Sequence, residues 1–283
     1  MMNKVIISVD CICDLPRKMW QELDVNMMHF YITTEEGRFR DIFELNAECI
    51  IDYLEKGKEA SSSSAPAEEY KAHFLDLKKR YKDSIIIHIS AAKNVSESYN
   101  TASEVAKTME DVYIIDSGQL SGGMCFMAMT ASEMAKAGAD YELIISELNR
   151  MREKISTSFI VDNTSHLYRN GKIKKNVMKI CTMFSLHPIL KLTDSSMKAA
   201  SLCIGKPNFY AKTYVRKMLK KPESIDPEVV FLISAGCSYE YLESIKKEIQ
   251  KYIKCQRLIV NTASATVTSN CGPGTFGVLF MRK

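Results

Sequence analysis

The 283-residue sequence has no apolar run that approaches the roughly 18 residues of a membrane-spanning helix. Only a short apolar stretch precedes Asp10, so the longer hydrophobic region of a secretory signal is also missing. The nine cysteines are an odd number without regular spacing, which fits a reducing cytoplasm better than a disulfide scaffold. We therefore expect a cytoplasmic protein with no integral membrane segment.

Glycine is also scarce, with 12 residues in the chain. Glycine-rich turns let backbone N–H groups approach the phosphates of nucleotides, and the sequence contains neither GxxxxGK[ST] nor GxGxxG. The nucleophile motif GxSxG and the zinc motif HExxH are missing as well. The sequence thus predicts no cofactor and none of these familiar catalytic centres.

Metal and nucleic-acid binding are not favoured either. Cys11 and Cys13 lie two residues apart, but no second close pair of cysteines or histidines accompanies them. The 38 basic and 34 acidic residues are interspersed rather than gathered into one basic stripe. We expect no metal site and no nucleic-acid partner.

What the sequence does contain is a regular alternation of short β-rich runs with helix-like segments, typical of an α/β fold. We expect two α/β domains, at residues 1–155 and 156–283, with a ligand in the cleft between them. The first is expected to be Rossmann-like with a mainly parallel sheet, and the second a smaller mixed α/β domain. We also expect residues 27–33 to form one strand. The plain interpretation of residues 61–66, SSSSAP, is a polar linker whose last serine caps the next helix.

Hydroxyl groups cluster at two turn-to-helix junctions, at residues 62–64 and at Ser96 and Ser98. Hydroxyls and free backbone amides at such places can bind a carboxylate, but they can equally cap the helix that follows. The residues alone leave both interpretations open. The same holds for Asp10, Asp14, Asp116 and Asp162, which sit near predicted strand ends where either ligand sites or turns need an aspartate.

Several segments, in the right order along nearly the whole chain, resemble motifs of the DegV family. The segment that contains Asp10 and Asp14 is similar to the family's opening DS…DLP, with Cys11 in place of serine. Residues 63–66 are similar to TSQP, and residues 89–102 to ISS…SGTYQSA. Further similarities cover residues 39–41, 115–117, 161–173, 187–190 and 272–277.

The resemblance implies a protein that binds a long-chain fatty acid, with the carboxylate at a serine-rich site between the domains and the tail in an apolar tunnel. The carboxylate ligands it implies are Ser63, Ser64, Ser96, Ser98, Asn270 and Lys172. Two of these depart from the family pattern, because Asn270 stands for a histidine and Lys172 for an arginine. Asparagine carries no charge, and lysine lacks the bidentate fork of arginine.

Family members that carry lipids serve as non-catalytic subunits of a fatty acid kinase, so the resemblance also implies an ATP-binding kinase subunit as a partner. Burying about fifteen methylenes contributes on the order of 12 kcal/mol before ordering costs, far more than one lost charge-assisted hydrogen bond. We therefore expect Asn270 and Lys172, in place of histidine and arginine, to affect the orientation of the carboxylate more than they affect acyl binding.

Two alternatives remain at this stage. The chain could be an enzyme that acts on a small carboxylate with Asp10 or Asp116 and the serine hydroxyls in the cleft. The 16 methionines, several of them within residues 124–134, could form the walls of an acyl tunnel or simply pack the core.

Overall fold

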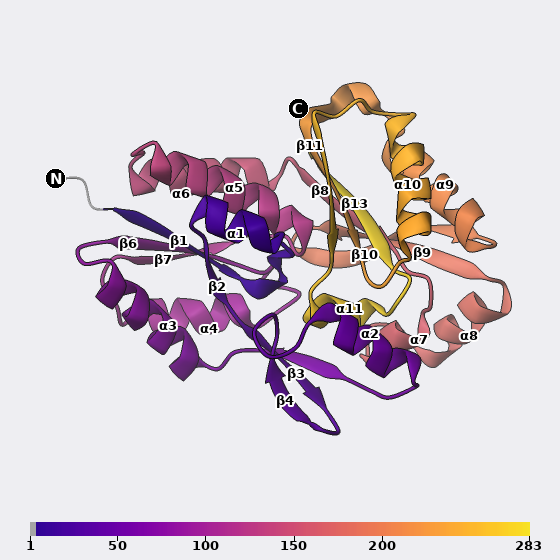
Figure 1. Ribbon diagram of the computed structural model, residues 1–283, viewed down its shortest axis with the longest axis horizontal. Helices are drawn as coiled ribbons and strands as arrows, with labels where there is room; N and C mark the ends of the chain where they lie inside the picture. The colour runs from indigo at the N-terminus through magenta and orange to yellow at the C-terminus, as the bar shows by residue number, and fades with distance from the viewer. Residues whose placement is uncertain (1–3) are drawn as a thin grey trace.

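A computed structural model describes residues 4–283, and Figure 1 shows its elements in chain order. The strands are β1 (Val5–Asp10), β2 (Asn26–Met28), β3 (Phe30–Thr34), β4 (Gly37–Arg40), β5 (Ser61–Ser64), β6 (Ile85–Ser90), β7 (Val112–Asp116), β8 (Ile155–Ile160), β9 (Leu186–Thr193), β10 (Ser196–Ile204), β11 (Ile225–Ser234), β12 (Arg257–Thr262) and β13 (Phe276–Arg282). The α-helices are α1 (Arg17–Leu23), α2 (Ala47–Glu55), α3 (Ala67–Arg80), α4 (Ser98–Ala106), α5 (Gly122–Lys136), α6 (Tyr141–Arg152), α7 (Ser165–Arg169), α8 (Lys175–Met183), α9 (Pro207–Met218), α10 (Tyr239–Gln250) and α11 (Ala265–Cys271). Two short 3-10 helices are η1 (Cys11–Cys13) and η2 (Pro222–Ser224).

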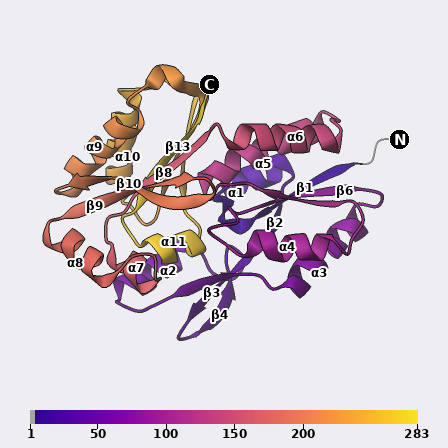
Figure 2. The same cartoon turned by 180° about the vertical axis from the view of Figure 1, so that it is seen from behind.

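The first part of the chain forms a parallel four-stranded sheet with the order β2-β1-β6-β7. Helices α5 and α6 cover one face and α3 and α4 cover the other, as Figures 1 and 2 show from opposite sides. Because both faces are covered, β1 and β6 are buried along their whole length. Ile85, Ile87 and Ile89 pack toward α5, whereas Ile86 packs toward α3. The predicted Rossmann-like parallel sheet is confirmed.

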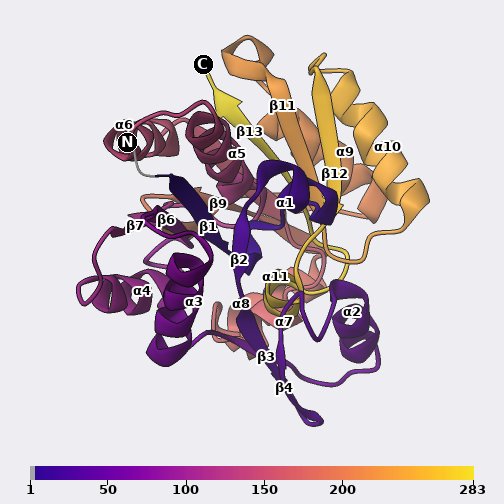
Figure 3. The ribbon, with the colours of Figure 1, turned by 60° about the vertical axis from the view of Figure 1, so that its left-hand side comes forward.

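A small antiparallel sheet, with the order β4-β3-β5, extends from this domain (Figure 3). Two expectations are wrong here. Residues 27–33 do not form one strand, because β2 pairs with β1 of the parallel sheet, whereas β3 pairs with β4 and β5. The serines at 61–64 are not a linker, because they form strand β5 along β3.

The later part of the chain forms a mixed six-stranded sheet with the order β10-β9-β8-β13-β11-β12. Only the pair of β11 and β12 is parallel within it. Side chains alternate between its faces, as the two-residue period of a strand requires. Val230 and Leu232 join the cluster formed with α9 and α10, and Phe231 and Ile233 join the cluster that contains α5.

Helix α5 lies between the two large sheets and contacts β1 and β6 on one side and β8, β11 and β13 on the other. Its side chains belong to one apolar cluster that extends from Val5 to Leu279. The two α/β parts therefore share a core. The predicted boundary near residues 154–157 coincides with the start of β8, the first strand of the mixed sheet, and the division into 1–155 and 156–283 stays a prediction.

Within residues 4–283, no helix has both the length and the apolar character that crossing a membrane requires. The same residues contain no group of three or more His, Cys, Asp or Glu side chains placed to hold a metal ion.

Candidate functional site

The serines of β5 alternate between two faces because they form a strand. Ser62 and Ser64 pair with the buried residues Ile32 and Phe30, and both are partly buried. Ser63 is exposed and faces the opposite side. The last serine does not cap α3, because the residue before that helix is Pro66 and no side chain caps it. Of the two serines predicted here, only Ser64 shares its face with Ser62.

Asn270 meets this face of β5 from the far end of the sequence. Its Nδ2 donates to Ser62 Oγ at 2.8 Å and to the carbonyl of Thr266 at 2.8 Å. Both amide hydrogens are then used, so Asn270 itself offers a ligand only its acceptor oxygen. Ser62 Oγ accepts from Asn270, and among residues 4–283 its own hydrogen has no acceptor, so it can donate to a ligand. Asn270 therefore orients a donor, and the donor is Ser62, which the sequence analysis did not include among the site residues.

The start of α11, which carries Asn270, is held by two aspartates from the first part of the chain. Asp41 accepts hydrogen bonds from the backbone N–H groups of Ala265 at 3.1 Å and Thr266 at 2.8 Å. Asp14 Oδ1 accepts from the N–H of Ser264 at 2.7 Å. Burial raises the pKa of Asp41, and it raises the pKa of Asp14 to about 7. The positive end of this helix is thus occupied by side-chain carboxylates rather than left free for a ligand.

Ser96 and Ser98 have different roles at the start of α4. Ser96 Oγ accepts from the N–H of Ser98 at 3.2 Å, but the residue before α4 is Glu97 and no side chain caps this helix. Ser98 is fully buried, and among residues 4–283 its hydroxyl has no partner in hydrogen-bonding geometry. It nevertheless lies close enough to the Tyr70 hydroxyl to lower the pKa of Tyr70, which burial, followed by the charge of Asp10, raises. A buried hydroxyl without a partner is costly, so Ser98 is the better candidate to bind a ligand oxygen.

Lys172 lies in the exposed segment between α7 and α8. Its backbone N–H donates to the carbonyl of Leu167 at 2.8 Å. Asn170 Nδ2 donates to the carbonyls of His166 and Ser269, each at 3.0 Å, which ties this segment to α11. Lys172 therefore follows a segment that contacts α11, but its side chain is exposed rather than placed among the serines.

The aspartates of the enzyme hypothesis are already occupied. Asp10 is fully buried and accepts from Tyr70 Oη at 2.9 Å and from the N–H of Ala91 at 2.8 Å. Asp116 accepts from two backbone N–H groups, at 2.9 and 3.1 Å, and lies 3.4 Å from an Arg152 nitrogen. Both carboxylates stabilise the loops after their strands.

Two open cavities, of about 380 and 340 Å³, lie on the surface of the first part of the chain. Asp116 borders the smaller one, whereas the predicted serines, Asn270 and Lys172 border neither. Met124, Met127 and Met129 of α5 are buried in the core shared by the two sheets. These methionines pack the core, and the apolar tunnel stays a prediction.

The chain is similar to known proteins over nearly its whole length. The family model of DegV, described as an uncharacterised protein family, matches residues 4–283. A curated relative, the fatty acid-binding protein of Thermotoga maritima, is 24% identical over 288 residues, covering 97% of this chain and 96% of its own.

Two solved structures have the same fold. The one described as fatty acid binding of a DegV family protein from Thermus thermophilus has a TM-score of 0.88 at 20% identity, covering 99% of this chain and 100% of its own. A DegV family protein from Eubacterium eligens loaded with heptadecanoic acid has a TM-score of 0.83 at 17% identity, with 99% and 100% covered. At these identities the structures establish the two-part α/β fold, and the match of the family model over residues 4–283 shows that the chain belongs to the DegV family.

Proposed function

We propose that this protein binds a long-chain fatty acid, with the carboxylate between β5 and the start of α4 and the acyl chain extending into apolar surroundings. The observation that carries the proposal is that one hydroxyl donor on each of these two elements has no acceptor within residues 4–283. Ser62 is oriented by Asn270 and its own hydrogen is unused, and the buried Ser98 hydroxyl has no partner. Ser64 shares the face of Ser62 and adds a third hydroxyl.

These donors suit a carboxylate because an ionised carboxylate only accepts hydrogen bonds. The position also fits a ligand between the two parts of the chain, because β5 belongs to the first and α11 to the second. Two related structures support the ligand class, since one is described as fatty acid binding and one as loaded with heptadecanoic acid. A neutral site lacks the charge that a histidine or arginine would add, so we expect tail burial to supply most of the affinity.

We further propose that the protein acts as a carrier without catalysis of its own. Asp10 and Asp116 are engaged with backbone and side-chain donors, which supports a structural role for both. A separate ATP-binding kinase subunit remains the proposed partner, and the nine unpaired cysteines fit a cytoplasmic setting. Incubation of the loaded protein with ATP and a candidate kinase should give acyl phosphate; acyl binding without it would restrict the role to storage or transport.

Mass spectrometry after solvent extraction of the purified protein tests the ligand class. We expect the extract to contain a long-chain acyl species. The extract of a variant whose carboxylate site is disabled should lack it. If extraction yields no acyl species and added fatty acid does not bind, the proposal is wrong.

Neighbouring serines of β5 provide a matched pair for the carboxylate position. Ser62→Ala removes a charge-assisted hydrogen bond, worth roughly 1.5–3 kcal/mol, so affinity for a fatty acid should fall about 10- to 150-fold. Ser63→Ala lies on the opposite face and should change affinity less than about twofold. Ser98→Ala should resemble Ser62→Ala. Equal effects of the two β5 substitutions would contradict the assignment of the face.

A further inference from the structure

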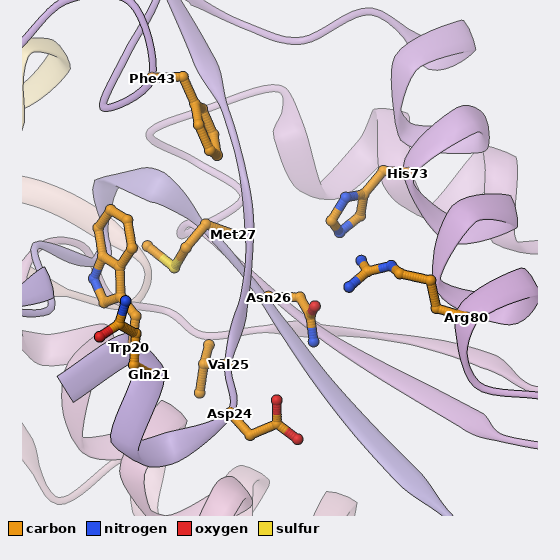
Figure 4. A pocket seen from close by; sticks show the side chains of 9 residues that line it. All are labelled: Trp20, Gln21, Asp24, Val25, Asn26, Met27, Phe43, His73 and Arg80. Atoms are coloured by element: carbon orange, nitrogen blue, oxygen red, sulfur yellow. The ribbon is translucent and has the colours of Figure 1, made fainter. Parts of the chain in front are cut away.

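The larger cavity lies away from the serines, between α1, β2, α3 and the segment that follows β4. Its volume of about 380 Å³ is at the lower end of the range for small-molecule sites. Figure 4 shows Trp20, Met27 and Phe43 toward one side and His73 and Arg80 on the opposite side. The remaining residues around it are Gln21, Asp24, Val25 and Asn26. The cavity therefore has an aromatic and apolar side and a polar side.

His73 stands at the end of a buried chain of polar groups. Its Nε2 lies 2.8 Å from Ser8 Oγ, and Ser8 Oγ lies 2.9 Å from His88 Nδ1. His88 Nε2 is 3.2 Å from Asp10 Oδ1, whose carboxylate accepts from Tyr70 and Ala91. Among residues 4–283, His88 Nε2 makes no hydrogen bond, so its contact with Asp10 is one of proximity alone.

Ser8 Oγ lies between the two rings and hydrogen-bonds to a nitrogen of each. Burial, followed by the nearby His88 and Arg80, lowers the pKa of His73 to about 3, so the ring of His73 is neutral. Its Nδ1 has no hydrogen-bond partner within residues 4–283. The polar side of the cavity therefore offers a ring nitrogen that can hydrogen-bond to a ligand.

Arg80 adds a cation beside this ring nitrogen. Its Nε donates to Asp76 at 2.8 Å, and its two terminal nitrogens have no acceptor in the described part of the chain. Figure 4 shows the guanidinium directed into the same space as the ring of His73. The other charge at the cavity, Asp24, is paired with Lys4 at 3.9 Å. A ligand carboxylate is the natural partner for the free side of a guanidinium.

The apolar side favours an aromatic ring. The indole N–H of Trp20 donates to the carbonyl of Leu15, so the side chain presents only its ring to the cavity. Met27 adds a polarizable sulfur, which makes favourable contacts with aromatic rings. Phe43 is 56% exposed, which is unusual for a phenylalanine and leaves apolar surface for a ligand to cover.

We propose that this cavity is a second ligand site that binds a small aromatic acid with a hydroxyl group beside its carboxylate. The ring packs against Trp20, Met27 and Phe43, the carboxylate pairs with Arg80, and the hydroxyl group hydrogen-bonds to His73 Nδ1. This site is separate from the serine site and does not depend on the proposed fatty acid function. It is linked to that site structurally, because Asp10 at the far end of the polar chain holds the N–H of Ala91, a few residues before Ser96.

Trp20 is the only tryptophan of the chain, so its fluorescence reports on this cavity alone. Titration with 3-phenyllactate should give a saturable change. Removing the hydroxyl, as in 3-phenylpropionate, should weaken binding by about 2- to 10-fold, and removing the carboxylate, as in 2-phenylethanol, by at least about 10-fold. No saturable change with phenyllactate, or equal affinity for the three probes, would overturn the proposal.

Arg80→Gln should weaken phenyllactate binding by at least about 10-fold and leave 2-phenylethanol unaffected. The matched control is Arg38→Gln, because Arg38 stacks on Tyr31 at 3.6 Å and does not border the cavity. Circular dichroism checks that both variants fold. The comparison of the three probes on the unaltered protein tests the site even if a variant does not fold. An unchanged affinity in Arg80→Gln, or displacement of phenyllactate by a long-chain fatty acid in direct competition, would place the probe elsewhere and refute the site.

Discussion

Replacing Asp14 by asparagine should make the protein more stable at neutral and alkaline pH. Burial raises the pKa of this carboxyl from its usual 3.8 to about 7 in the folded chain. The folded state therefore keeps a proton that the unfolded state loses, and the stability of the unaltered protein falls as pH rises from about 4 to about 7. Between pH 5 and pH 8 the loss attributable to Asp14 is on the order of 2.5 kcal/mol.

Asparagine can replace the aspartate without losing its contacts. The amide oxygen can accept from the N–H of Ser264, and the amide nitrogen can donate to the hydroxyl of Ser121, which now donates to the carboxylate. Asp14 also has a φ of 53°, a left-handed conformation that asparagine adopts readily. The substitution removes the titrating group and keeps the geometry.

Urea unfolding at pH 5 and at pH 8 gives the free energy of unfolding of Asp14→Asn and of the unaltered protein. The effect is the change, between the two pH values, in the difference between the two proteins. We expect this difference to shift in favour of the variant by about 2.5 kcal/mol between the two pH values. Asp24→Asn is the control, because Asp24 shares the left-handed conformation at φ 54° but is exposed, and it should show no such shift. A difference for Asp14→Asn that does not change with pH would refute the reasoning.

Three further substitutions test the packing and the site. Gly123→Ala should lower the free energy of unfolding by about 1–3 kcal/mol in denaturant titrations, because the new Cβ would lie 2.3 Å from Thr157 Oγ1; an unchanged midpoint would contradict this close approach of α5 and β8. Asn270→Ala removes the group that orients Ser62 and should weaken fatty acid binding about 2- to 10-fold by calorimetry, less than Ser62→Ala itself. Lys172→Gln should leave fatty acid affinity within about twofold, because the side chain is exposed; a larger loss would bring the lysine into the carboxylate site.

Most of the fold was predictable because the strands buried on both faces stand out in the sequence as short apolar runs. β1 and β6 read as apolar runs, and α6 has an aspartate N-cap at Asp140 whose side chain accepts from the helix. The errors arose where tertiary pairing overrides local composition. Four successive serines look like a linker, yet they form β5 because β3 provides a partner strand.

The carboxylate site itself stays a prediction, and the sequence did not indicate which serine contacts Asn270. That serine is Ser62, which is 208 residues away in the sequence. Which serine faces inward depends on the register of β5 with β3, and composition does not reveal a register. Once β5 is recognised as a strand, its two-residue period separates Ser62 and Ser64 from Ser63. The polar chain from Asp10 to His73 joins residues of three elements, and no local pattern in the sequence indicated it.

A crystal structure of the protein after incubation with heptadecanoic acid would test the central claim most directly. We predict that the carboxylate lies within hydrogen-bonding distance of the hydroxyls of Ser62 and Ser98, with the acyl chain directed away from solvent between the two parts of the molecule. A carboxylate bound on the Ser63 side of β5, or a site that stays empty at a saturating concentration of the acid, would contradict the account.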